Sequence, residues 1–183
     1  MFRPLAFAIA LFALADAGSA ADPAPAPKVA VGQAAPAFKI TDSAGKIVDL
    51  AELTAKGPVL VRLTCGCSGC DKELAYFQQI NEAYKGQGLT SLFVFKEADT
   101  KMAKYAAEKK LDVRYAVDPK GESWATFQTK TMPSNFLIGK GGKIVAISSG
   151  CDPSGLLANT VSEKAGKLIG TAPVDVKGKV EKK

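Results

Sequence analysis

Residues 63–74 read LTCGCSGCDKEL and hold three of the four cysteines of the chain. The apolar run VLVRL at 59–63 comes directly before them and predicts a buried strand. Residues 70–84 then carry apolar side chains at helical spacing, which predicts a helix. The three cysteines therefore lie where a strand passes into the first turn of a helix.

Cys67 and Cys70 form a C-x-x-C pair at the N-terminus of this predicted helix. Unpaired backbone N–H groups and the positive end of the helix dipole stabilise a thiolate there. We therefore expect Cys67 to be the attacking sulfur and Cys70, one turn further in, to resolve a mixed disulfide. Asp71 and Glu73 lie in the same turn and oppose a thiolate, whereas Lys72 partly offsets them.

The composition is that of an ordinary globular protein, with 183 residues of which 47% are apolar and 23% charged. The sequence contains no histidine. This excludes a Ser-His-Asp triad, Cys-His catalysis, an H-E-x-x-H zinc site and c-type haem attachment. The net charge of +6 is scattered and lacks the aromatic interleaving of nucleic-acid grooves, so we expect no nucleic-acid partner.

The two ends of the chain differ from its body. Residues 1–20 combine a basic start, an apolar run at 5–15 and small residues at the end, which is typical of a cleaved secretory signal peptide. That run is well short of the roughly 20 residues that a membrane-spanning helix needs, so we expect no membrane insertion after cleavage. Residues 21–28 predict an extended Pro/Ala linker and residues 171–183 a flexible basic tail. The mature chain is expected in a periplasm or outside the cell, where disulfides are permitted.

Residues 29–170 are long enough for one domain. Beyond the first strand and helix, the pattern predicts a strand at 89–95, a helix at 100–110 capped by Asp99, a hairpin of strands at 135–138 and 143–148, and a last helix opened by Asp152-Pro153. This order predicts an α/β fold with a central mixed β-sheet and helices on both faces.

The C-x-x-C pair, followed by a basic residue and a glutamate, resembles the thioredoxin-fold redoxins of the AhpC/TSA-like superfamily, in particular secreted TlpA/ResA-like thiol-disulfide oxidoreductases. The segments VGQAAPAF at 31–38 and TMPSNFLI at 131–138 are similar to that family's opening and to its cis-proline strand. The resemblance spans about residues 30–170. It implies a thioredoxin-like fold, no cofactor, and a secreted enzyme that exchanges disulfides with partner proteins.

The resemblance also implies roles for individual residues. Cys67 and Cys70 are the implied catalytic pair, and Glu73 either assists proton transfer near Cys70 or is a solvated carboxylate. The Met132–Pro133 peptide is implied to be cis and to face the dithiol, so that the Met132 backbone pairs with an extended substrate segment. The implied partners are protein thiols and disulfides and an electron donor or acceptor, and we expect a monomer.

Cys65 and Cys151 lie outside the C-x-x-C pair. In this fold the last strand runs parallel to the strand that ends at Cys65, and Cys151 follows that last strand. All four sulfurs are therefore expected at one edge of the sheet. A neighbour-but-one strand lies roughly 9–10 Å away, beyond the ~7 Å limit for a bridge unless the loops bend inward. We predict that Cys151 lies near the dithiol and forms a possible second disulfide with Cys65; two unpaired buried thiols are the alternative.

A peroxiredoxin-type thiol peroxidase is a competing interpretation. Thr64 stands three residues before Cys67, as in the peroxiredoxin signature T-P-G-C-T. However, Leu60 occupies the place of that family's proline, and Pro133 falls where its arginine is expected.

Two further interpretations do not involve catalysis. The four cysteines could form a thiolate site for Cu(I) or Zn(II) in a redoxin-like carrier, although the C-x-x-x-C spacing and the histidine of Sco-type copper proteins are absent. Alternatively, the chain is a domain that uses its disulfides only for structure.

Overall fold

The computed structural model describes residues 28–182, so the predicted signal peptide and all of the predicted linker except Lys28 lie outside the described residues. Seven strands are present in this range: β1 (Lys39–Thr41), β2 (Ile47–Asp49), β3 (Val59–Thr64), β4 (Thr90–Phe95), β5 (Arg114–Val117), β6 (Ser134–Ile138) and β7 (Ile144–Ser149). The α-helices between 28 and 182 are α1 (Leu50–Lys56), α2 (Ser68–Tyr84), α3 (Asp99–Glu108), α4 (Glu122–Thr126), α5 (Leu156–Ile169) and α6 (Val176–Glu181). None of the described helices is long and apolar enough to cross a membrane.

Strand β3, which ends directly before Cys65, lies at the centre of a five-stranded sheet with the order β5-β4-β3-β6-β7. It pairs in parallel with β4 and antiparallel with β6, and β7 is antiparallel to β6. Strand β7 therefore runs parallel to β3, as predicted, and both strands end at the same edge. The predicted mixed sheet is confirmed.

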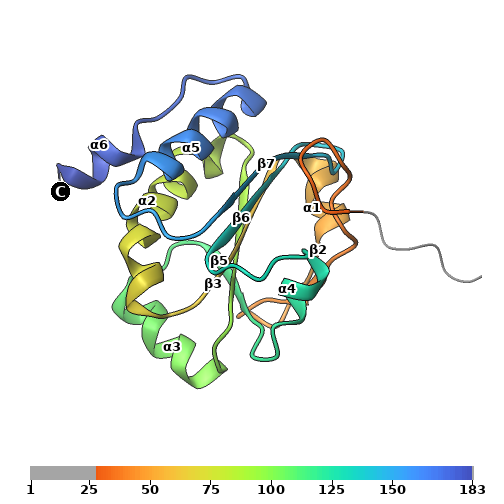
Figure 1. Ribbon diagram of the computed structural model, residues 1–183, viewed down its shortest axis with the longest axis vertical. Helices are drawn as coiled ribbons and strands as arrows, with labels where there is room; N and C mark the ends of the chain where they lie inside the picture. The colour runs from red at the N-terminus through yellow and green to blue at the C-terminus, as the bar shows by residue number, and fades with distance from the viewer. Residues whose placement is uncertain (1–27, 183) are drawn as a thin grey trace, which may run out of the picture.

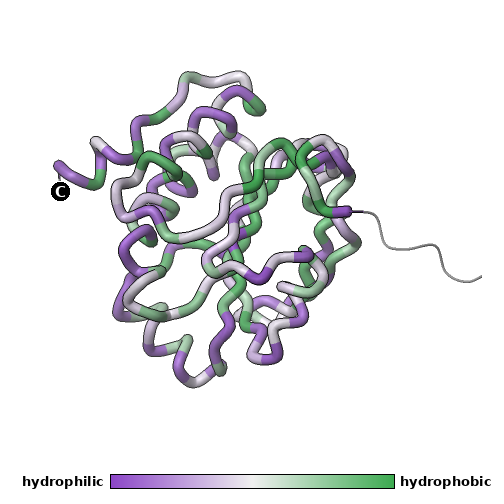
Figure 2. Tube along the Cα trace, viewed as in Figure 1, coloured by the Kyte–Doolittle hydropathy of each residue, from purple (hydrophilic) through white to green (hydrophobic). Residues whose placement is uncertain are grey.

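Helices cover both faces of this sheet, as expected (Figure 1). Alternate side chains of β3 divide between the faces: Leu60 belongs to the core under α2, α3, α5 and α6, whereas Val61 and Leu63 belong to the core under α1, α4 and the β1–β2 hairpin. Figure 2 shows the hydrophobic residues concentrated along the strands, with hydrophilic residues on the outer helices. All side chains of β3 are buried, and they alternate between these two separate cores.

Three helix starts differ from the sequence-based expectation. Helix α2 begins at Ser68 with Cys67 as its N-cap, two residues before the predicted start. Asp99 lies inside the first turn of α3, since the extended N-cap residue is Ala98. The Asp152-Pro153 pair does not open α5, which begins at Leu156; instead the Asp152 carboxylate accepts a hydrogen bond from the Leu157 N–H at 2.7 Å, inside the first turn.

The prediction of a flexible C-terminal tail is wrong for the described residues 171–182. They include helix α6, whose first residue Val176 is completely buried. The Tyr84 hydroxyl of α2 accepts a hydrogen bond from the Val174 N–H at 2.9 Å, and the Asp175 carboxylate caps α6. This segment carries three lysines, but its three valines, Val174, Val176 and Val180, supply an apolar face that packs against α2 and α5.

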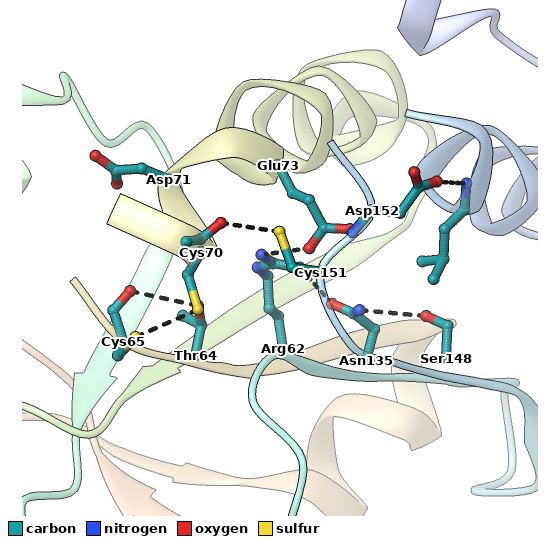
Figure 3. Close-up of polar contacts among 12 residues, drawn as sticks. Arg62, Thr64, Cys65, Cys70, Asp71, Glu73, Asn135, Ser148, Cys151 and Asp152 are labelled. Atoms are coloured by element: carbon teal, nitrogen blue, oxygen red, sulfur yellow. Dashed lines mark hydrogen bonds and ion pairs between the residues drawn. The ribbon is translucent and has the colours of Figure 1, made fainter. Parts of the chain in front are cut away.

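A fully buried ion pair joins the sheet to α2. The Arg62 guanidinium on β3 lies 3.2 Å from the Glu73 carboxylate on α2, and it donates a hydrogen bond of 2.8 Å to Asn135 Oδ1 on β6 (Figure 3). The guanidinium also lies 4.1 Å from the centre of the Phe77 ring. The second carboxylate oxygen of Glu73 accepts a hydrogen bond from the Asp152 N–H at 2.8 Å. The alternative of a solvated Glu73 is therefore wrong, because this side chain points at the sheet.

Glu73→Gln should destabilise the protein by about 3–5 kcal/mol, because it leaves the Arg62 charge buried without its partner. Replacing both residues, in Arg62→Met/Glu73→Gln, should recover most of this loss, since the buried charge is then removed. Urea denaturation measures both changes. Glu108→Gln, which breaks an exposed ion pair with Lys104, is the matched control and should leave the midpoint almost unchanged. If Glu73→Gln were as stable as this control, the assigned role of the ion pair would be contradicted.

Candidate active site

Three cysteine sulfurs meet where β3 passes into α2. Cys65 and Cys67 are joined in a disulfide with their Cα atoms 5.4 Å apart, and Cys70 is a free thiol. The Sγ atoms of Cys65 and Cys70 are 3.3 Å apart (Figure 3). All three Sγ atoms lie within 4.8 Å of one another. The predicted C-x-x-C pair is thus brought together, but Cys65 forms a third member of the cluster.

The three cysteines differ in their access to solvent. Cys65 and Cys70 are 8% and 4% exposed, whereas Cys67 is an exposed residue. Cys67 is the N-cap of the 17-residue helix α2, and its side chain makes no capping hydrogen bond. The backbone N–H groups of the first turn therefore lie beside the one sulfur of the cluster that a large partner can reach.

The negative charge of Asp71, which opposes a thiolate at this helix end, is balanced from α3. Its carboxylate accepts a hydrogen bond from the Tyr105 hydroxyl and forms an ion pair of 2.5 Å with Lys109. Burial, together with the hydrogen bond to Asp71, raises the pKa of Tyr105, so the phenol stays protonated. The sequence assigned Asp71 an opposing role but could not show its two partners, which come from another helix.

Tyr105 also packs against the turn that links the first two cysteines. A Cβ atom at Gly66 would lie 3.3 Å from Cδ2 of the Tyr105 ring, tighter than an ordinary contact. An aromatic ring from α3 therefore covers that turn. Sequence reasoning missed Tyr105 because nothing in its local pattern indicates this contact.

The Met132–Pro133 peptide bond is cis, as predicted. Pro133 is buried and directly precedes Ser134, which pairs with Leu63 near the end of β3. The proline therefore lies at the same edge of the sheet as Cys65. Met132 beside it is half-buried.

Cys151 lies near the cysteine cluster, as predicted, but it is not bonded to Cys65. Its exposed thiol donates a hydrogen bond of 2.9 Å to the Gly69 carbonyl oxygen, in the first turn of α2 (Figure 3). The predicted Cys65–Cys151 pairing is therefore absent. The physical reason is proximity: Cys67 follows Cys65 in the same turn, whereas Cys151 lies in the segment after β7, a strand two positions away from β3 in the sheet.

This geometry permits two kinds of sulfur chemistry. A disulfide in contact with a free thiol can undergo exchange. Once the disulfide is reduced, Cys65, Cys67 and Cys70 form a set of three soft donors that suits Cu(I) or Zn(II). The buried Arg62 guanidinium lies within electrostatic range of Cys70 and Cys151, and burial lowers its pKa while the Glu73 charge opposes that shift.

Known proteins share both the sequence and the fold of this chain. The ResA thiol-disulfide oxidoreductase of Bacillus thuringiensis subsp. konkukian is 30% identical over 119 residues, which cover 64% of this chain and 69% of that protein. The thioredoxin domain of a thiol-disulfide oxidoreductase from Bacteroides vulgatus matches with a TM-score of 0.64 and 27% identity, over 75% of this chain and 99% of that one. A peroxidoxin from Mycobacterium tuberculosis, at 21% identity and a TM-score of 0.61 over 76% of this chain and 96% of that one, shares the fold.

These relatives confirm two predictions, namely a thioredoxin-like α/β fold and an enzyme of the thiol-disulfide oxidoreductase class. The model of the AhpC/TSA family matches residues 31–147, a range that contains the cysteine cluster and the cis-proline. This match covers more than half of the chain. The protein therefore belongs to the AhpC/TSA family.

Proposed function

We propose that this chain is an extracytoplasmic thiol-disulfide oxidoreductase that exchanges disulfides with partner proteins. The observation that carries the proposal is the placement of an exposed Cys67 at the N-terminus of α2, with Cys70 buried one turn further in. The Cys67 thiolate attacks a partner's disulfide, and one partner sulfur leaves as a thiol. Cys70 then attacks Cys67 Sγ and releases the other partner sulfur, so that the enzyme ends oxidised and the partner reduced.

The substrate's backbone binds beside the cis-proline. A segment that approaches Cys67 in an extended conformation can pair with the Met132 backbone, in the way a strand adds to a sheet edge. Pro133 contributes by holding that backbone at the edge where β3 ends. The half-buried Met132 side chain supplies an apolar contact for the segment.

Glu73 acts as a positioning residue in this scheme. Its two carboxylate oxygens already bind Arg62 and the Asp152 N–H, so the side chain ties the second turn of α2 to the sheet and to the segment after β7. The cysteines at the start of the same helix are held in place as a result.

The proposed compartment rests on the signal-like residues 1–20. The direction of exchange depends on the reduction potential of the cysteines. A redox titration that gives about −270 mV would favour a reductant, and one near −120 mV an oxidant.

A metal carrier is the second candidate function, favoured by the three sulfurs within 4.8 Å of one another. It predicts stoichiometric Cu(I) or Zn(II) bound to the reduced protein, measured by elemental analysis after gel filtration. A peroxidase function has less support, because Leu60 and Pro133 stand where peroxiredoxins have a proline and an arginine. Rapid consumption of hydrogen peroxide by the reduced protein would reverse that ranking.

Cys67→Ser should reduce insulin reduction to the uncatalysed rate, because it removes the only exposed sulfur of the cluster. The matched control is Cys151→Ser, which removes an exposed thiol outside the proposed exchange and should keep a rate close to that of the wild type. Insulin turbidity in the presence of dithiothreitol measures both rates. Full activity in Cys67→Ser would contradict the proposed attacking role.

Cys151 should react slowly with alkylating reagents. Burial, followed by the negative charge of Glu73, raises the pKa of the Cys151 thiol, so its thiolate forms only at a higher pH than that of an ordinary cysteine. The test uses a variant with serine at positions 65, 67 and 70, in which the alkylation rate should rise with pH. The pH at which the rate reaches half its maximum should be higher for the folded protein than for the same protein unfolded in urea. Iodoacetamide kinetics measure this difference. Equal midpoints would refute the prediction.

A further inference from the structure

The disulfide in this structure is not the one that a C-x-x-C enzyme uses. It joins Cys65 to Cys67 and leaves Cys70 free. The Cys70 thiol nevertheless touches this disulfide, since its Sγ lies 3.3 Å from Cys65 Sγ. The sulfur that resolves the mixed disulfide in the proposed function is thus in contact with a second sulfur that the proposed function does not use.

We propose that Cys65 is a third redox-active sulfur. Its thiolate attacks Cys67 Sγ in the Cys67–Cys70 disulfide that the proposed exchange forms, and Cys70 leaves as a thiolate. The oxidised enzyme then carries its disulfide in two registers, Cys65–Cys67 and Cys65–Cys70. This inference rests on the proposed function, in which Cys67 and Cys70 react. The Cys70 thiolate attacks Cys65 Sγ, the Cys65–Cys70 bond forms, and the bond to Cys67 breaks. The electron pair leaves with Cys67 Sγ. Cys70 gives its proton to solvent before it attacks, and Cys67 leaves as a thiolate, so the step consumes no oxidant or reductant.

The surroundings of the three sulfurs favour this exchange. A sulfur whose thiolate is stabilised is the better leaving group, and Cys67 is the sulfur at the N-terminus of α2. The opposing charge of Asp71 is held by Tyr105 and Lys109. The bond that replaces Cys65–Cys67 joins two buried residues, Cys65 and Cys70. The exchange therefore moves the disulfide beneath the surface and returns Cys67 to the surface as a thiolate.

Two functional consequences follow. Cys65 and Cys70 flank Cys67 in sequence and contact each other, so either of them can attack Cys67 Sγ and release a bound partner. In addition, the oxidised enzyme keeps an exposed nucleophile, whereas an enzyme with only a C-x-x-C disulfide has none. An oxidised molecule can thus attack a second disulfide and rearrange it.

The test uses reduced variants in a Cys151→Ser background, so that the cluster holds the only thiols. Each variant is mixed with oxidised glutathione, the reaction is quenched with acid, and the mass of the protein is measured by mass spectrometry. Cys65→Ser/Cys70→Ser should accumulate a glutathione adduct on Cys67, because no sulfur remains to release it. Cys65→Ser and Cys70→Ser should each release glutathione and form an internal disulfide.

The outcomes separate the two proposals. An adduct that accumulates in Cys70→Ser as fully as in the double variant overturns the role of Cys65 but leaves Cys67 and Cys70 as the exchanging pair. The absence of any adduct in the double variant overturns the attacking role of Cys67, and this inference with it.

A second measurement requires no change in the cluster. Tryptic peptide 63–72 contains all three cysteines, so labelling of the oxidised Cys151→Ser protein, followed by reduction and a second label, identifies the free one. The two registers predict a first label on both Cys67 and Cys70, in separate molecules. A first label on Cys70 alone overturns the second register.

Discussion

The buried ion pair between Arg62 and Glu73 is the interaction on which the arrangement of this site depends. It connects the central strand to the second turn of α2, and Asn135 and the Asp152 N–H extend it to β6 and to the segment after β7. Each of these elements carries or adjoins a residue of the site. A buried charge without its partner is strongly unfavourable, so these elements cannot separate without breaking the ion pair or exposing it to solvent.

The ion pair lies beneath a cluster of sulfurs whose members differ in environment. Cys67 is exposed and lies against the helix N-terminus, whereas Cys65 and Cys70 are buried below it. Thiol-disulfide exchange requires an accessible attacking sulfur and a second sulfur within reach. The fold therefore assigns different roles to residues of identical chemistry, through burial and position on α2.

Residues of α3, distant in the sequence, contact the turn that carries these sulfurs. The ring of Tyr105, on α3, covers the turn at Gly66. The hydroxyl of the same tyrosine binds Asp71, which also pairs with Lys109. One helix thus both packs against the cysteine turn and neutralises the charge that would oppose a thiolate there.

The local sequence pattern was sufficient to predict β3, α2 and the place of the cysteines at their junction. Apolar runs and helical spacing depend on neighbouring residues alone. The same reasoning failed for the tail, where three valines among lysines form a face that packs against α2 and α5. It also failed for Glu73, whose partner Arg62 appears in the sequence as an interruption of an apolar strand.

The sequence by itself determined the α/β order, the family resemblance and the place of the sulfurs at the start of a helix. The tertiary structure alone decided which sulfurs touch, that Cys65 bonds to Cys67 and not to Cys151, and that Glu73 is buried. These contacts join residues from different elements or depend on the path of a turn. No periodicity along the chain encodes them, because they arise only when the sheet brings its strand ends to a common edge.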